Sequence, residues 1–202
     1  MTRLRVNPTR MEMRNLERKL QIASRGHKLL KEKQDSLVQR FLHLSEETKN
    51  QRRRVDYEFE KMYGLYHVAS LNSDASHIEK HLSKKTLDAH VDAHREHELG
   101  VRVLKYDLNI EDQEVSSRSV FTISHEVLQI EAMYAQMLPE LVKLAELEKR
   151  CMVLASEIKE TRRRVNALEH RTIPDTKETI AYIKMKIDDH ERSQKARVMK
   201  VK

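Results

Sequence analysis

Residues 13–44 read MRNLERKLQIASRGHKLLKEKQDSLVQRFLHL, and this stretch decides the fold. Mostly apolar residues recur in it in alternating steps of three and four, and the pattern continues unbroken to Ala69. The positions of this seam are Met13, Leu16, Leu20, Ala23, His27, Leu30, Gln34, Leu37, Phe41, Leu44, Thr48, Gln51, Val55, Glu58, Met62, Leu65 and Ala69. A 3.5-residue repeat held over this length predicts a long helix that supercoils left-handed around a partner helix.

The start of this helix is marked by Asn7 as N-cap and Pro8 as first helical residue. From Pro8 to about Ala69 it would hold ~60 residues and extend ~90 Å. We therefore assign residues 1–70 to a first long helix.

The polar members of the seam are His27, Gln34, Thr48, Gln51 and Glu58. Polar seam residues lower the stability of a coiled coil but can fix its register and partner orientation. Alternatively, the seam is partly wet there or covered by another protein. The residues favour neither interpretation.

A second long helix is predicted over residues 124–202. Its seam runs through Val127, Ile130, Tyr134, Met137, Leu141, Leu144, Leu147, Cys151, Leu154, Ile158, Thr161, Val165 and Leu168 and continues through Ile173, Ile180, Ile183 and Ile187. The two steps of three from Leu141 to Leu147 form a stammer, which overwinds a coiled coil locally. We interpret Cys151 as a small core residue.

Two prolines predict bends in this second helix. Pro139 removes a backbone hydrogen bond to Ala135 and so predicts the first. Thr172 and Asp175 resemble an internal capping signal, with Thr172 as N-cap. We therefore expect Pro174 to mark a second kink rather than the end of the helix.

Residues 71–123 lack the heptad pattern and predict a small knob. His77 to Leu87 could form a short helix. Leu87 to His94 alternate in period two, which indicates a strand, and Val101 to Tyr106 indicate another. Arg95 to Gly100 would form the turn between these strands.

Histidines concentrate in the knob at His77, His81, His90, His94 and His97, close to Asp88 and Asp92. Imidazole and carboxylate groups suit zinc or nickel. Strand alternation, however, places His90, Asp92 and His94 on the face opposite Leu87, Ala89, Val91 and Ala93. We favour the interpretation that they form the wet face of a half-buried hairpin, and we predict no metal site.

These elements define the fold class as all-α. We expect a long two-helix antiparallel left-handed coiled coil, with a small helix and β-hairpin knob at the turn end. Because the two seams can bury each other only in an antiparallel arrangement, both termini should lie at the end remote from the knob.

The composition agrees with long helices. The 202 residues include only three Gly and three Pro, with 35% charged residues and 4% aromatic residues. So few turn-forming residues argue against an all-β sandwich or a doubly wound α/β enzyme. One Cys argues against a disulfide framework, and no apolar run approaches the ~18 residues that a membrane span needs. We expect a soluble, cytoplasmic protein.

The net charge of +7 arises from 39 basic and 32 acidic residues interspersed along the chain. This pattern is typical of solvated helix faces, and we do not expect nucleic-acid binding. The basic triplets Arg52–Arg54 and Arg162–Arg164 either pair with local Glu residues or contact an acidic partner.

No catalytic motif is present. Gly26, Gly64 and Gly100 are isolated, so there is no phosphate-binding loop, and no G-x-S-x-G elbow occurs. A two-helix coil also lacks the concave pocket that excludes water from a reaction. The sequence therefore predicts neither a catalytic residue nor a cofactor, and argues against an enzyme acting alone.

Three stretches of the sequence resemble the D subunit of V/A-type ATPases. Residues 6–41 resemble the opening of that family and contain RGHKLLK at Arg25–Lys31. Residues 157–202 resemble its closing segment and contain RRRVNALE at Arg162–Glu169, and LAELEKRC at Leu144–Cys151 fits as well. The knob, residues 71–120, matches poorly. The short C-terminus resembles the prokaryotic form.

The resemblance implies a non-catalytic central shaft of a rotary ATPase or ATP synthase, which couples ATP turnover to proton or sodium transport. The end with both termini would enter the catalytic A/B ring, the knob end would meet the C (or d) subunit of the membrane rotor, and the F subunit would bind the shaft. The protein would then be a peripheral, cytoplasmic part of a complex at the prokaryotic plasma membrane, without inserting into it.

We expect the segments Met11–Ala23 and Ile180–Val198 to contact the ring. The candidate contact residues are Met11, Arg14, Arg18, Lys184 and Arg192. The alternative is a coiled-coil scaffold without a rotary role.

Overall fold

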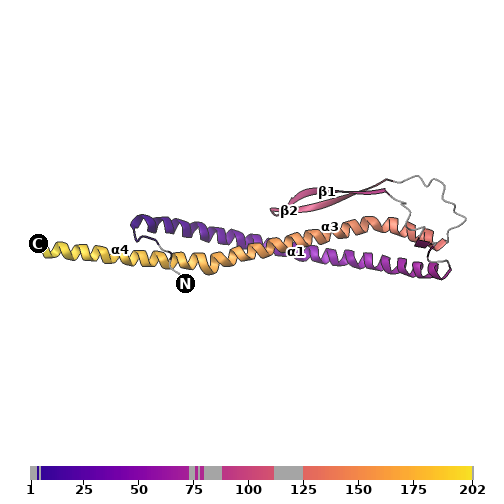
Figure 1. Cartoon of the computed structure of the whole chain (residues 1–202). Helices are drawn as coiled ribbons and strands as arrows, with labels where there is room; N and C mark the ends of the chain where they lie inside the picture. The colour runs from indigo at the N-terminus through magenta and orange to yellow at the C-terminus, as the bar shows by residue number, and fades with distance from the viewer. Residues whose placement is uncertain are drawn as a thin grey trace. The chain divides into compact units, whose positions relative to one another are not determined.

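A computed structural model describes residues 4, 6–72, 76, 78–79, 88–111 and 125–201. The elements in chain order are α1 (Arg10–Asn72), β1 (Asp88–Glu98), β2 (Val101–Glu111), α3 (His125–Ala167), the π-helical turn η2 (Leu168–Thr172) and α4 (Ile173–Val201) (Figure 1). They fall into two compact units. Unit 1 comprises Met1–Val38 and Ser156–Lys202, and unit 2 comprises Gln39–Ala155.

The first helix begins two residues later than expected. Arg10 is its first residue, and the Thr9 hydroxyl accepts a hydrogen bond from the Glu12 backbone N–H at 3.2 Å. Thr9 and Glu12 have the spacing of a capping box, and Thr9 supplies the side-chain cap. The prediction of Asn7 as N-cap and Pro8 as first helical residue is therefore wrong, although the helix of 63 residues is otherwise as long as expected.

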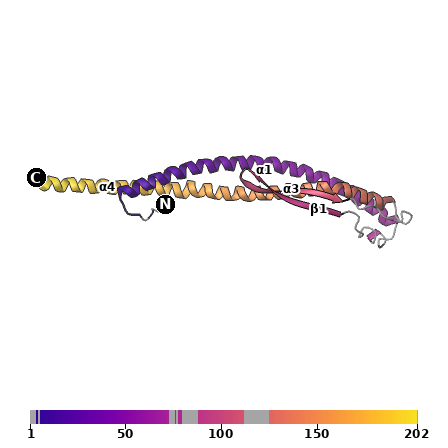
Figure 2. The same cartoon turned by 90° about the horizontal axis from the view of Figure 1, so that it is seen from above.

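In unit 1, the start of α1 pairs with the end of the chain in antiparallel order. Arg10 forms an ion pair with Glu191, His27 lies 3.3 Å from Glu169, and Lys33 lies 2.9 Å from Glu157. Residue numbers rise on one helix as they fall on the other, which confirms the antiparallel pairing within this unit. α4 continues beyond Glu191 to Val201, past the start of α1 (Figures 1 and 2).

The seam of unit 1 is partly polar. Leu16, Leu37, Val165 and Ile183 are buried as expected. On α4, however, the side chains buried before Ile183 are Asp175, Thr176 and Thr179, whereas Ile173, Ile180 and Ile187 are only half-buried. The five-residue turn η2 immediately precedes this polar stretch.

The helix does not restart at Thr172. Ala167 and Ile173, on either side of η2, both have right-handed helical backbone angles. The Thr172 hydroxyl donates to the Ala167 carbonyl at 3.2 Å instead of capping a new helix. The predicted internal N-cap is therefore wrong, and the irregularity at this place is a π-turn.

Unit 2 pairs the rest of α1 with α3, again in antiparallel order. Thr48 contacts Cys151, Arg52 lies 2.8 Å from Glu148, and Asn72 lies 3.4 Å from Glu126. The buried apolar side chains of the two helices in this unit are Leu44, Val55, Ala69, Val127, Ile130, Met137, Leu144, Leu147 and Leu154. All nine are predicted seam positions.

One seam prediction in unit 2 is wrong. Tyr134 is 46% exposed, and Met133 takes the half-buried position beside it. A tyrosine hydroxyl is satisfied by water, whereas a thioether gains from burial. α3 continues through Pro139. The left-handed supercoil and the bends at both prolines stay predictions.

The hairpin is present and longer than expected. β1 and β2 pair in antiparallel register, with Glu98 opposite Val101. Leu99 and Gly100 connect them with φ angles of 51° and 74°, the positive values that a two-residue hairpin turn requires. The predicted turn from Arg95 to Gly100 is therefore too long, because Arg95 to Glu98 belong to β1.

The hairpin also buries a different face from the one predicted. Ala89, Val91 and Ala93 are exposed, whereas Val101 and Val103 near the turn are buried. Val103 lies opposite Glu96, so the buried valines share the face that carries the histidines farther from the turn. The hairpin is buried only near its turn, where charged side chains from the helices hold it.

The short helix predicted from His77 to Leu87 lies mainly outside the described residues, as do His77 and His81 themselves. Of this region, residues 76, 78 and 79 are described, and they are helical. Ile78 packs with Ala69 and Val127 in a small buried cluster. In the part of the chain that the structure describes, no helix combines the length and the apolar character that crossing a membrane requires.

Candidate functional site

The polar seam residues are the first candidates for a functional role. The Gln51 side chain is 4% exposed, and its amide donates to both the backbone carbonyl and the carboxylate of Glu140. Thr48 donates to the Leu44 carbonyl at 2.7 Å, and its oxygen lies 3.4 Å from the Cys151 sulfur. These contacts place polar groups of α1 against particular residues of α3.

Of the other three polar seam residues, His27 and Gln34 lie in unit 1, whereas Glu58 lies in unit 2 and is half-buried. The His27 imidazole Nε2 is 3.3 Å from the Glu169 carboxylate, which belongs to η2. Gln34 is half-buried. A contact that forms at only one alignment of two helices can define their register, and both His27 and Gln51 make contacts of this kind.

The candidate ring-contact residues all lie on exposed positions of unit 1. They are Met11, Arg14 and Arg18 on α1 and Lys184 and Arg192 on α4. The Arg10–Glu191 ion pair brings the turn that holds Met11 next to the turn that holds Arg192. Among the described residues, the four basic side chains of this set form no ion pair, so their charges are available to a partner.

The Arg10–Glu191 pair also changes the pKa of the Glu191 carboxyl. The hydrogen bond from Arg10, and then its positive charge, lower the pKa of the Glu191 carboxyl below its ordinary value of 4.5. Both residues are largely exposed, so this contact fixes local geometry and adds little to stability.

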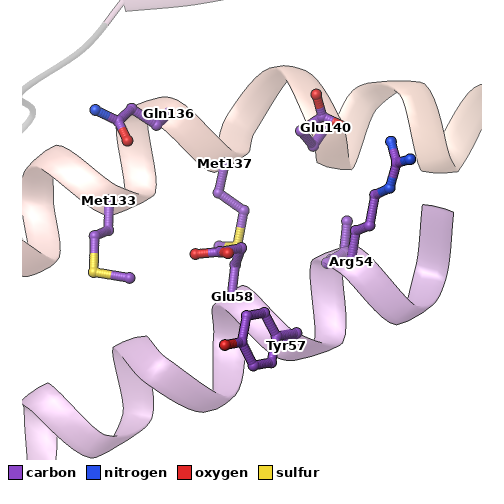
Figure 3. A pocket seen from close by; sticks show the side chains of 8 residues that line it. Arg54, Tyr57, Glu58, Met133, Gln136, Met137 and Glu140 are labelled. Carbon is purple, nitrogen blue, oxygen red and sulfur yellow. The ribbon is translucent and has the colours of Figure 1, made fainter. Parts of the chain in front are cut away.

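A hollow of about 410 Å³ lies between α1 and α3 in unit 2. Figure 3 shows Met133 and Met137 pointing from α3 toward α1, whereas Gln136 points away. Its lining residues are Arg54, Val55, Tyr57, Glu58, Met133, Gln136, Met137 and Glu140. The hollow lies where Tyr134 leaves the seam.

Lys61, next to this hollow on α1, has a perturbed pKa. Its ammonium lies 3.0 Å from Glu58 and 4.1 Å from the centre of the Tyr57 ring. The hydrogen bond to Glu58 raises the pKa of Lys61 above 10.5. Lys61 is therefore a fixed positive charge at neutral pH and not a candidate base.

The histidines of the hairpin are exposed, as the sequence favours. The His90 imidazole lies 3.2 Å from Asp92, and the His94 imidazole lies 3.5 Å from Asp107. Among the described residues, no group of three His, Cys, Asp or Glu side chains is placed to hold a metal ion.

The basic triplets divide between the two interpretations. Arg52 pairs with Glu148 at 2.8 Å, and Arg164 pairs with Glu160 one turn earlier. The other four arginines of the two triplets are exposed. Arg164 thus pairs with a local Glu, whereas the partner of Arg52 lies on the facing helix α3, and contact of the triplets with an acidic partner stays a prediction.

Sequence reasoning missed the attachment of the hairpin to the helices. Arg40 of α1 forms an ion pair with Glu98. Arg150 of α3 lies 3.2 Å from Glu96 and 3.0 Å from Glu146, and it also donates to the Leu104 carbonyl at 3.4 Å. Glu146 in turn accepts from the Tyr106 backbone N–H at 2.9 Å. Side chains of α3 therefore bond to two backbone groups on the outer edge of β2, the Leu104 carbonyl and the Tyr106 N–H.

Comparison with known proteins shows which class of protein has this sequence and fold. The model of the family described as the D subunit of ATP synthase matches residues 12–202. The V-type ATP synthase D subunit of Thermoanaerobacter sp. (strain X514) is 40% identical over 205 residues, which cover 100% of this chain and 97% of that protein.

Two further relatives agree. The V-type ATP synthase D subunit of Streptococcus gordonii is 40% identical over 209 residues, covering both chains completely. That of Clostridium botulinum (strain ATCC 19397 / Type A) is 39% identical over 206 residues, covering 99% of this chain and 94% of the relative. The chain belongs to the ATP synthase D subunit family, as its terminal motifs predict. Each of these relatives is named as one subunit of a V-type ATP synthase and not as a whole enzyme.

Proposed function

We propose that the chain is the central shaft of a V/A-type rotary ATP synthase, transmitting torque between the A/B ring and the membrane rotor, which moves protons or sodium ions. The observation that carries this proposal is membership of the D subunit family over residues 12–202. Two antiparallel helices in each unit support it, because a pair of helices resists twisting better than one.

We infer that the terminal part of unit 1 enters the ring. Its exposed residues Met11, Arg14, Arg18, Lys184 and Arg192 are the proposed contacts, and the absence of internal ion pairs at the basic ones among the described residues supports this role. Coupling requires that such contacts differ between states of the ring.

The other partners follow from the same proposal. The knob would meet the C (or d) subunit of the membrane rotor, and the F subunit would bind the side of the shaft. The protein would then be a peripheral, cytoplasmic part of a membrane complex. The chain itself would bind neither nucleic acid nor a cofactor. The polar contacts of His27 and Gln51 would hold the register against the applied torque.

The test is co-expression of the chain with the A, B and F subunits of its own organism. We expect one copy to co-purify with each A/B ring and to change the ATPase activity of the ring. A chain that folds but does not associate with the ring would contradict the shaft and favour the non-rotary scaffold.

A charge-reversal pair tests the ring contacts. Arg18→Glu with Lys184→Glu should reduce the effect of the chain on ATPase activity. The matched control is Arg53→Glu with Lys149→Glu, which changes the same charge at two exposed positions of unit 2. Equal losses in both pairs would contradict the proposed contacts and leave the shaft itself standing.

A further inference from the structure

The π-turn η2 is the main irregularity in the helices of unit 1. It occupies Leu168–Thr172, and the backbone N–H of Ile173 donates to the Leu168 carbonyl, five residues earlier. None of its five residues is buried. Because regular helix continues on both sides, this turn interrupts the ladder of backbone bonds inside a helix rather than at its end.

The backbone hydrogen bonds in the helical turns after η2 are weakened as well. Pro174, two residues after it, has no backbone N–H to donate. The Thr176 hydroxyl donates to the Thr172 carbonyl, and the Thr179 hydroxyl donates to the Asp175 carbonyl, each at 2.7 Å. Threonine hydroxyls that bond back to the preceding turn destabilise and bend helices.

α1, the helix that faces η2, carries a helix-destabilising glycine beside this turn. The contact between His27 and Glu169 places that turn of α1 beside η2. Gly26 precedes His27, and a Cβ added to Gly26 would meet no atom within 4 Å. Packing inside the protein therefore does not require glycine, although glycine makes a helix less stable than alanine does.

The packing between the helices is also polar here. Between the buried residues Val165 and Ile183, the buried side chains on this side of the helix pair are Asp175, Thr176 and Thr179. Short polar side chains bury less apolar surface than leucine or isoleucine, so they hold two helices together less strongly. Weak backbone bonds and weak packing therefore coincide.

We propose that residues 168–176 together with residues 24–28 form a hinge, at which the helix pair of unit 1 bends. Four independent features meet there: the π-turn, Pro174, Gly26 and the polar buried side chains. The buried apolar side chains Val165 and Ile183 hold the helix pair on either side, so bending is confined to the hinge. The hinge does not depend on the proposed function, although a shaft turning in a ring would use it.

Hydrogen–deuterium exchange of the full-length chain tests local opening. We expect amides 170–178 to exchange at least about tenfold faster than amides 158–165 of the same helix. Deleting His170 removes the extra residue of the π-turn, and Pro174→Ala restores an N–H. These two changes together should slow the exchange of amides 170–178 by about tenfold.

Glycine provides the matched control. Gly26→Ala should slow exchange around residue 26. Gly64→Ala makes the same change at another α1 glycine with open space around it, and it should leave exchange in the hinge unchanged. Equal exchange in residues 158–165 and 170–178 of the natural chain would overturn the proposal.

Spin labels measure the bending itself. In a Cys151→Ser chain, labels at Lys159→Cys and Asp188→Cys flank the hinge at exposed positions, ~44 Å apart along the helix. The distribution of label distances should be broad, and it should narrow when His170 is deleted and Pro174→Ala is introduced. A narrow distribution in both chains would show that η2 is a rigid irregularity and would overturn the hinge.

Discussion

The attachment of the hairpin to α3 depends on Arg150, and Arg150→Leu should release it. Arg150 is only 15% exposed and contacts two carboxylates and one backbone carbonyl. Leucine keeps most of the apolar volume but leaves Glu146, which is 17% exposed, without its positive partner. Breaking a buried ion pair leaves an uncompensated charge behind.

The size of the effect follows from this burial. Removing one partner of a fully buried pair costs about 3–5 kcal/mol, whereas exposed pairs contribute at most about 1 kcal/mol. Glu96 is 49% exposed, so its share is small. Glu146 lies one turn from Arg150 on α3 itself, so the main effect comes from leaving its carboxylate without a positive partner while β2 covers it. We expect local opening of β2 to become easier by roughly 2–3 kcal/mol, or about 30- to 150-fold.

The Tyr106 amide reports this opening directly. Its N–H points from the outer edge of β2 to Glu146, and it is protected only while the hairpin stays on α3. Exchange of this amide, followed by NMR, should accelerate about 30- to 150-fold in Arg150→Leu, while circular dichroism shows an intact helix content.

Arg52→Leu is the matched control for this prediction. Arg52 is 62% exposed and forms one ion pair, with Glu148. Its loss should change the exchange of the Tyr106 amide less than about fivefold. Unchanged exchange in Arg150→Leu, or equal acceleration in both variants, would refute the reasoning that the buried ion pair holds the hairpin.

Four further predictions follow from single residues. Leu99→Gly should stabilise the hairpin by about 1 kcal/mol, measured as slower amide exchange in both strands, because leucine is strained at a positive φ. Thr9→Ala should destabilise the first turn of α1 by about 1 kcal/mol, seen as faster exchange at its amides, and serine should restore it. Leu154→Ala should lower the free energy of unfolding in urea by about 2–5 kcal/mol, because this side chain is fully buried. By NMR, the carboxyl of Glu191 should titrate below 4.5 and return toward 4.5 in Arg10→Gln. Since the folded-state pKa is lowered, the contact persists at neutral pH and is lost as the pH falls through that pKa.

The long helices could be predicted because burial along them is periodic. A 3.5-residue repeat from Met13 to Ala69 requires only that one face be covered, whatever covers it. The exact start of α1 could not be predicted in the same way, because Asn7 and Thr9 are both good caps. The geometry of Glu12 decides between them, since its N–H reaches the Thr9 hydroxyl.

The hairpin shows where local sequence stops being informative. Alternation correctly indicated β1, but it could not say which face would be covered. That choice depends on Arg40 and Arg150, which lie far away in the sequence and meet Glu98 and Glu96 only in the folded unit. The two-residue turn could not be predicted, because leucine is unfavourable at the positive φ that Leu99 adopts in it.

The sequence does contain a signal for the π-turn. The seam steps from Leu168 to Ile173, a distance of five residues, and no α-helical turn places such residues on one face. A capping signal at Thr172 and a kink at Pro174 were inferred there, whereas a π-turn absorbs the extra residue without breaking the helix.

The polar side chains of the two units make different kinds of contact. In unit 2, polar contacts such as Gln51 with Glu140 and the Tyr106 backbone N–H with Glu146 join separate elements and fix one alignment. In unit 1, the hydroxyls of Thr176 and Thr179 donate to the backbone of their own helix, and Thr179 also accepts from the Leu4 backbone N–H before α1, so neither hydroxyl contacts α1 itself. Polar groups of the first kind resist relative movement, whereas those of the second kind only avoid unsatisfied atoms. Compliance should therefore be found around Thr176 and Thr179 in unit 1, whereas Gln51 and Glu146 give unit 2 a fixed registry. A shaft working inside a changing ring would need both properties.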